Sequence, residues 1–211
     1  MEFHVLEPKS GKPPSNMVVL LHGYGSNGQD LISLAPYFQK NLPNTVFLSP
    51  NAPFPCEIMP ESGFQWFSLG EYTPEKLLEG SKQAAPLLNT FIDEQLEAYN
   101  LTADKLALVG FSQGTMMSLY VAPRRNPRIA GVLGYSGALT GEANLPEGNL
   151  PIHLIHGESD SVVPVQAYHK AKVFLEQAGY PVTGHTTAYL DHSIDEQGIE
   201  SGADFLEKVL L

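Results

Sequence analysis

The stretch Leu106-Ala107-Leu108-Val109-Gly110-Phe111-Ser112-Gln113-Gly114-Thr115 decides the fold. Its apolar run leads into the pattern Gly-x-Ser-x-Gly, which predicts a buried strand, a tight turn that carries Ser112, and the start of a helix. Such a turn holds its serine in a strained backbone conformation and lifts the hydroxyl clear of the sheet. Side chains at Gly110 and Gly114 would collide where the incoming strand and the outgoing helix pass close together. A chance match in a chain with 19 glycines is the competing interpretation.

Length, charge and cysteine content restrict the function classes. The 211 residues suit one domain over residues 1–211. The net charge of −11 should repel phosphate backbones, so we expect no nucleic-acid partner. The single cysteine, Cys56, excludes an internal disulfide and fits a reducing compartment. The first residues do not have the pattern of a signal peptide, and no apolar run approaches the roughly 20 residues of a membrane span. The sequence therefore predicts a cytoplasmic protein without a transmembrane segment.

Strand and helix patterns alternate along the chain without an internal repeat. Apolar runs predict strands at 17–21, 44–50, 106–111, 129–136, 152–157 and 182–190. Helical spacing appears between them, most extensively at 74–100, and Ser193 to Glu196 reads as a capping box for the final helix. The proline-rich segment 50–73 lacks periodicity and predicts an ordered loop over the carboxyl end of the sheet. We therefore expect an α/β fold with a mostly parallel central sheet and helices on both faces.

A glycine-rich loop, His22-Gly23-Tyr24-Gly25-Ser26-Asn27-Gly28, follows the first buried strand. Backbone N–H groups in such a loop can form part of an oxyanion hole. Hydrolases whose serine sits in a Gly-x-Ser-x-Gly turn take one donor from an early loop and another from the residue after the serine. A plain turn is the alternative. A phosphate-binding loop is disfavoured, because the Walker lysine and the full Gly-x-Gly-x-x-Gly spacing are both missing.

A serine hydroxyl needs a base to take its proton, and that base needs a third group to orient it. Ser112, Asp160 and His192 occur in the chain order Ser, Asp, His that accompanies a Gly-x-Ser-x-Gly turn, known as a nucleophile elbow, and each follows a predicted strand. They should therefore gather at one edge of the sheet. His22 and His185 compete with His192, but one belongs to the glycine loop and the other lies inside a strand.

Other acidic and aromatic residues also need an assignment. Glu158 and Asp191 are rivals of Asp160, and Asp191 reads as a solvated charge or as support for the neighbouring histidine. His153 and His156 point to opposite faces of a strand, so we expect no metal site there. In the 50–73 loop, Phe64 and Trp66 are candidates for the wall of an apolar substrate pocket, with core packing as the alternative for Trp66.

Several spaced blocks together resemble the phospholipase/carboxylesterase family of α/β hydrolases, which includes the acyl-protein thioesterases. The blocks are Leu21-His22-Gly23-Tyr24-Gly25, Trp66-Phe67, Gly110 to Gly114, His156 to Pro164, and His192-Ser193. The resemblance implies a serine esterase or thioesterase with Ser112 as nucleophile, His192 as base and Asp160 as its orienter. It also implies an oxyanion hole from the backbone N–H groups of Tyr24 and Gln113. Thr115 and Ser161 depart from the common family pattern, which often has glycine and proline there.

The expected activity is hydrolysis of uncharged esters or thioesters with an apolar acyl chain, through an acyl-enzyme and without a cofactor. The acyl chain would rest near Trp66 and Phe64. The same triad also serves peptidases and lactone-type hydrolases, and a catalytically silent binding protein on this fold is a further alternative. A homodimer is compatible with the sequence.

Overall fold

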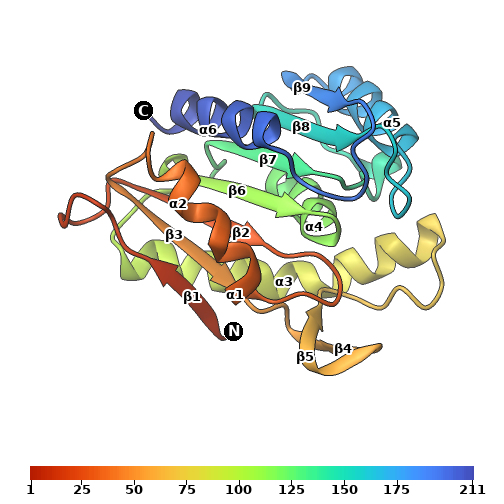
Figure 1. The fold of residues 1–211 in the computed structure, drawn as a ribbon, viewed down its shortest axis with the longest axis horizontal. Helices are drawn as coiled ribbons and strands as arrows, with labels where there is room; N and C mark the ends of the chain where they lie inside the picture. Colours follow the sequence, from red (N-terminus) through yellow and green to blue (C-terminus); the bar gives the residue numbers. More distant parts are fainter.

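The computed structural model describes all 211 residues and is organised around a seven-stranded sheet (Figure 1). The strands lie in the order β1-β3-β2-β6-β7-β8-β9. Strand β1 pairs antiparallel with β3, and every other pair is parallel. Their bounds are β1 Phe3–Leu6, β2 Asn16–Leu21, β3 Thr45–Pro50, β6 Leu106–Phe111, β7 Gly131–Tyr135, β8 Ile152–Gly157 and β9 Val182–Thr187. The predicted mostly parallel sheet is confirmed.

Helices cover both faces of this sheet, as predicted. Helices α3, α4 and α5 contribute to the core on one face, and α1, α2 and α6 to the core on the other. Strand β2 shows the division: Met17 and Val19 belong to the first core, whereas Val18 and Leu20 belong to the second. The helices are α1 Gly28–Leu31, α2 Ala35–Phe38, α3 Pro74–Ala98, α4 Gln113–Val121, α5 Gln166–Gln177 and α6 Glu196–Leu210. None is both long enough and apolar enough to cross a membrane.

The segment 50–73 contains a β-hairpin where the sequence predicted only a loop. Strand β4 (Phe54–Cys56) pairs antiparallel with β5 (Met59–Gln65), and the two form a separate two-stranded sheet. Both strands of a hairpin have a free edge, and a proline, which lacks an N–H donor, is tolerated at such an edge. This accounts for strand structure around Pro55 and Pro60 despite the absence of clear periodicity.

Two boundaries in the last quarter of the chain also differ from the prediction. Strand β9 ends at Thr187 rather than at Leu190. Helix α6 is capped by Asp195, whose carboxylate accepts a hydrogen bond from Gly198 N at 2.8 Å, so the predicted capping box at Ser193 is wrong. The N–H of Ser193 instead donates to Asp191 O at 2.7 Å, which places a tight turn before the helix begins.

The parallel arrangement brings the loops that carry the candidate residues to one edge. In Figure 1 the arrowheads of β6, β7 and β8 point toward the same side of the molecule. The glycine-rich loop follows β2, Ser112 follows β6, Asp160 follows β8, and His192 follows β9. The fold therefore gathers segments that are far apart in the sequence at the carboxyl edge of the sheet.

Candidate active site

Ser112 occupies the sharp turn between β6 and α4. Its backbone angles, φ 53° and ψ −116°, lie outside the regions that residues with side chains ordinarily adopt. Its N–H donates to Tyr135 O at 2.9 Å, which ties the turn to the neighbouring strand β7. Strain of this kind persists only where the surroundings fix it, and it is characteristic of a nucleophile elbow. The predicted strained turn is confirmed.

The two glycines of the pattern are sterically required, for different reasons. A Cβ atom on Gly110 would lie 2.4 Å from Thr115 N, in the first turn of α4, as the sequence predicted. A Cβ atom on Gly114 would lie 1.8 Å from Leu21 O, at the end of β2. The helix therefore presses against a neighbouring strand as well as against the strand that leads into it. Only hydrogen fits at either position.

Asp160 and His192 are joined directly. Asp160 Oδ2 accepts a hydrogen bond from His192 Nδ1 at 2.8 Å, and the carboxylate is fully buried. The N–H groups of Val162 and Val163 donate to Asp160 Oδ1 at 2.9 and 2.7 Å, and they fix the orientation of the carboxylate. Because the carboxylate accepts from Nδ1, the neutral imidazole carries its proton there and leaves Nε2 free to accept. This is the tautomer that a general base requires.

His192 also lies beside the elbow. Its ring packs on Phe111, the residue before Ser112, with 4.8 Å between the ring centroids. No hydrogen bond joins the Ser112 hydroxyl to His192 in the structure. In enzymes without bound substrate, such contacts are often long and shorten only when substrate is in place. The elbow, the histidine and the buried acid thus form one group at the carboxyl edge.

Neither of the two rival acids reaches the imidazole of His192. Glu158 accepts from the hydroxyl of Thr186 at 2.8 Å. Asp191 accepts from the main-chain N–H of His192, not from its ring. A second histidine does approach the buried acid: Nε2 of His156 lies 3.4 Å from Asp160 Oδ2 and donates to Val163 O. Burial lowers the pKa of His156, which favours its neutral form.

Two backbone N–H groups in the segments beside Ser112 are available to a ligand. The loop that carries Tyr24 approaches the serine at Gly23, where a Cβ atom would lie 3.2 Å from Ser112 Cβ. The N–H of Gln113 is the first of α4 and has no carbonyl partner within its own helix. The N–H of Tyr24 has no partner in the structure, although Gly25 N donates to Phe64 O and Ser26 N donates to Gly23 O on either side of it. Free donors beside a serine can stabilise an oxyanion.

Trp66 does not line a pocket, which corrects one of the two expectations for the aromatic loop. Its side chain is completely buried, and its indole Nε1 donates to His22 O at 3.0 Å. Its backbone N–H donates to Gln113 Oε1 at 2.9 Å, while Gln113 Nε2 donates to Phe67 O at 2.8 Å. The packing of the hairpin against the elbow buries the whole side chain of Trp66. The tryptophan therefore anchors the loop that carries Tyr24.

Phe64, the other aromatic candidate, is half-buried and holds the same loop through its main chain. Its carbonyl oxygen accepts a hydrogen bond from Gly25 N, and its N–H donates to Ser26 O at 2.8 Å. Its ring lies 6.5 Å from the ring of His22, measured between centroids. Its partly exposed side chain remains available to a substrate.

His22 is a structural histidine. It is fully buried, its Nε2 accepts from Ala52 N at 2.9 Å, and its Nδ1 contacts Gly23 O at 2.7 Å. A backbone N–H can only donate and a carbonyl can only accept, so the proton resides on Nδ1. Burial lowers the pKa of His22 to about 4. Both ring nitrogens are occupied, which leaves neither for proton transfer.

An apolar groove of about 300 Å³ lies between the start of α3, the loop after β7, and α5. The lining residues include Tyr72, Leu77, Leu139, Val163, Ala167 and Phe174. Val163 connects the groove to the site, because its N–H donates to the Asp160 carboxylate. Burial, together with the charge of Asp160, raises the pKa of the Tyr72 phenol. The sequence did not indicate this groove.

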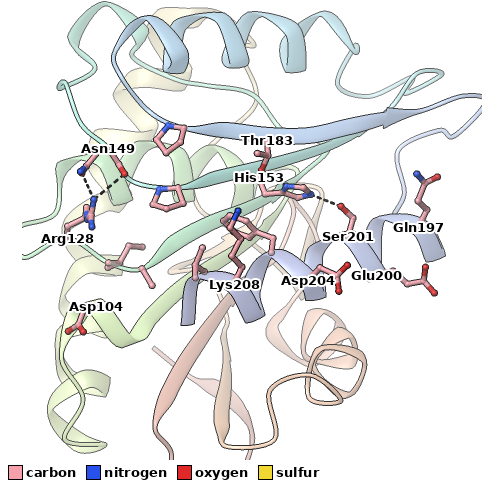
Figure 2. A pocket seen from close by; sticks show the side chains of 16 residues that line it. Asp104, Arg128, Asn149, His153, Thr183, Gln197, Glu200, Ser201, Asp204 and Lys208 are labelled. Carbon is pink, nitrogen blue, oxygen red and sulfur yellow. Dashed lines mark hydrogen bonds between the residues drawn. The ribbon is translucent and has the colours of Figure 1, made fainter. Parts of the chain in front are cut away.

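A larger cavity of about 980 Å³ lies at the opposite, amino-terminal edge of the sheet, between α6 and strands β8 and β9. Figure 2 shows that His153 points toward Ser201 there, and the two are 2.8 Å apart from Nε2 to Oγ. The other ring nitrogen meets the hydroxyl of Thr183 rather than a carboxylate. Burial and the proximity of His185 lower the pKa of His153 to about 4, and Ser201 lies inside a helix. This pair therefore lacks both a basic imidazole and an orienting acid.

Comparisons with known proteins find relatives that match almost the whole chain. The family model of phospholipases and carboxylesterases matches residues 3–210. Acyl-protein thioesterase 1 of Debaryomyces hansenii is 26% identical over 95% of this chain and 94% of its own. Esterase YpfH of Escherichia coli is 28% identical over 96% of this chain and 87% of its own. The crystal structure of esterase PE8 superimposes with a TM-score of 0.92 and 34% identity, covering 98% of both chains.

Proposed function

Because the chain belongs to the phospholipase/carboxylesterase family of α/β hydrolases, we propose that it cleaves its substrates with Ser112, His192 and Asp160 acting as a catalytic triad. Membership of this family makes the chain an enzyme that hydrolyses carboxylic esters or thioesters. The observation that carries the proposal is the 2.8 Å bond between His192 Nδ1 and the buried carboxylate of Asp160, beside a serine in a strained turn. No metal or organic cofactor enters the proposed mechanism.

The reaction proceeds in two steps. Ser112 Oγ attacks the carbonyl carbon while His192 Nε2 takes the hydroxyl proton, and the imidazolium then protonates the departing alcohol or thiol. Water next attacks the acyl-enzyme with His192 again as base, which releases the acid and restores the Ser112 hydroxyl. The Asp160 carboxylate stabilises the imidazolium in both steps. The tautomer that the Asp160 contact fixes supports the role of His192 as the base.

The developing negative charge on the substrate oxygen meets the N–H groups of Tyr24 and Gln113. Both groups lack a partner inside the protein, so no existing bond must break when the oxyanion forms. Each donor of this kind contributes about 3 to 4 kcal/mol of transition-state stabilisation. The bonds that hold the neighbouring Gly25 and Ser26 keep the first donor in position.

The acyl part of the substrate is apolar and uncharged. The groove between α3 and α5 supports this assignment, since it is mostly lined by apolar side chains and begins at Val163, next to Asp160. The net charge of −11 disfavours polyanionic substrates. The groove supports a path for the acyl chain that avoids the buried Trp66, near which the sequence first suggested it.

A fluorophosphonate probe tests the assignment of the nucleophile. The wild-type protein should be labelled, and Ser112→Ala should abolish labelling and turnover of p-nitrophenyl and acyl-thioester substrates while the thermal midpoint stays nearly unchanged. Ser136→Ala is the matched control, because Ser136 also follows a parallel strand and has a positive φ of 46° but lacks the second flanking glycine. Labelling should persist in that variant.

The other outcomes of this experiment separate the alternatives. Labelling that persists in Ser112→Ala would remove Ser112 from the proposed role. A wild-type protein that neither reacts with the probe nor turns over any ester would indicate a silent scaffold. A clear preference for peptides, lactones or highly charged esters would overturn the proposed substrate class.

A further inference from the structure

The side chain of Asp191 connects the two loops that carry the acid and the base. Its Oδ1 accepts from Ser161 N at 2.8 Å and from Ser161 Oγ at 2.8 Å, in the loop after β8. The same oxygen accepts from His192 N at 2.8 Å, in the loop after β9. Three donors from two loops thus converge on one carboxylate oxygen.

These contacts close a ring of four residues. Asp160 is covalently bonded to Ser161, which is hydrogen-bonded to Asp191. Asp191 is covalently bonded to His192, whose ring is hydrogen-bonded to Asp160. In such a ring, the separation of His192 Nδ1 from Asp160 Oδ2 depends on the link made by Asp191. A shift of the histidine loop along the acid loop would lengthen both linkages together.

The main chains of the two loops also touch, but upstream of the reacting groups. Ser159 N donates to Leu190 O at 2.9 Å, and a Cβ atom on Gly157 would lie 2.3 Å from the same carbonyl oxygen. The Asp191 carboxylate is the contact that reaches the residue after Asp160 and the N–H of His192 itself. The donors from Ser161 and His192 lower the pKa of Asp191, which keeps the carboxylate ionised as an acceptor.

From this closed ring we infer that Asp191 is a positioning residue, whose Oδ1 holds His192 in register with Asp160 for proton transfer. The inference rests on the proposed function, because it assigns Asp191 a role through that triad. All three bonds end on Oδ1, and Oδ2 has no hydrogen-bond partner in the structure. The role therefore requires an acceptor at Oδ1 and does not require the negative charge.

Substituting Asp191 with asparagine and alanine separates these two requirements. Asparagine keeps an oxygen where the three donors converge and places its amide nitrogen at the position of Oδ2, so kcat for p-nitrophenyl butyrate should stay within about threefold of wild type. Alanine removes the acceptor, and kcat should fall about 10-fold or more because small displacements of catalytic groups are costly. KM should change by less than about twofold in both variants, since neither touches the acyl groove.

A double-mutant cycle with Ser161→Ala tests whether the link passes through that serine. Ser161→Ala removes one of the three donors and should lower kcat in the wild-type background but have little further effect in Asp191→Ala. Glu158→Ala is the control, because Glu158 is an exposed acid in the same loop that contacts Thr186 and does not reach the histidine loop. That variant should keep the wild-type kcat.

Two results would overturn the inference. If Asp191→Asn loses as much kcat as Asp191→Ala, the charge matters rather than the position of the acceptor. If Asp191→Ala keeps the wild-type kcat, the link is unnecessary. Probe labelling of the wild-type protein distinguishes both results from failure of the proposed function, since a protein without the proposed triad would not be labelled at Ser112.

Discussion

The indole N–H of Trp66 donates to the main-chain carbonyl of His22 at 3.0 Å, and both residues are completely buried. The hairpin segment that contains the tryptophan is thereby fixed to the loop that contains Tyr24. His22 extends the connection, since its Nε2 accepts from Ala52 N after β3. The free N–H of Tyr24 consequently sits in a loop that is held from two sides by buried hydrogen bonds.

Trp66→Phe removes the donor of this contact and retains most of the aromatic packing. The buried carbonyl of His22 then lacks a partner, which costs about 1 to 3 kcal/mol of stability. The midpoint of urea unfolding should therefore fall, and kcat should fall with it as the position of Tyr24 N–H relaxes. Phe67→Leu, a loss of aromatic volume at a buried neighbour, should lower the midpoint without the same loss of kcat. Equal kcat values in the two variants would contradict the anchoring role.

The sequence predicted those parts of the site that depend on short-range patterns. The Gly-x-Ser-x-Gly pattern specifies a local turn, and chain order together with parallel strands was enough to gather Ser112, Asp160 and His192 at one edge. The role of Trp66 was not predictable in the same way. Its partner, His22, lies 44 positions away along the chain. In the sequence, a single tryptophan looks the same whether it packs in a core or lines a pocket.

The apolar groove was not predictable for a related reason. Its walls come from the start of α3, the loop after β7, and α5, which are far apart along the chain. The pairing of Ser161 with Asp191 likewise joins two loops that approach each other only when β8 and β9 are neighbours. Element boundaries such as the Asp195 cap depended on competition between nearby polar residues, each able to cap a helix.

Gly114→Ala tests the steric requirement at the elbow. The added carbon would overlap Leu21 O at 1.8 Å, and the next nearest atoms, Leu21 C and His22 O, are also backbone atoms, so no flexible side chain can move aside. We expect a loss of about 3 kcal/mol or more in the free energy of unfolding, because α4 must move away from β2. Gly70→Ala is the matched control, since its nearest neighbour, Ser68 Oγ, lies at 3.5 Å. Equal unfolding midpoints for the two variants would show that the elbow can relax.

Stability should depend on pH through His22. Burial lowers its pKa in the folded chain to about 4, below the ordinary value of 6.5 that applies after unfolding. The unfolded chain therefore binds a proton first, and the stability contributed by the neutral imidazole is complete above pH 6.5 and is lost as pH falls toward 4. At pH 5 the loss amounts to about 2 kcal/mol. His153, whose pKa is also lowered to about 4, acts in the same direction.

Urea unfolding at pH 7 and pH 5 measures this dependence, over a range in which carboxylates change their charge little. Proton NMR of the ring resonances provides an independent reading, because His22 should not titrate above about pH 5 in the folded protein. An unchanged unfolding free energy between the two pH values, or a His22 resonance that titrates near 6.5, would contradict the assignment of His22 as a neutral structural residue.

Filling the apolar groove should change the preference for acyl chain length. Ala167 lies on the groove wall formed by α5, so Ala167→Phe should obstruct the space beyond Val163. Each further CH₂ group that an acyl chain buries contributes about fourfold in kcat/KM. The variant should therefore lose at least about 10-fold in kcat/KM for p-nitrophenyl octanoate and keep its value for the acetate within about twofold. Val173→Phe adds the same ring on the half-exposed outer side of α5 and should leave both values unchanged. An unchanged ratio of the octanoate value to the acetate value would show instead that the acyl chain lies elsewhere, with the half-buried Phe64 as the remaining wall to test.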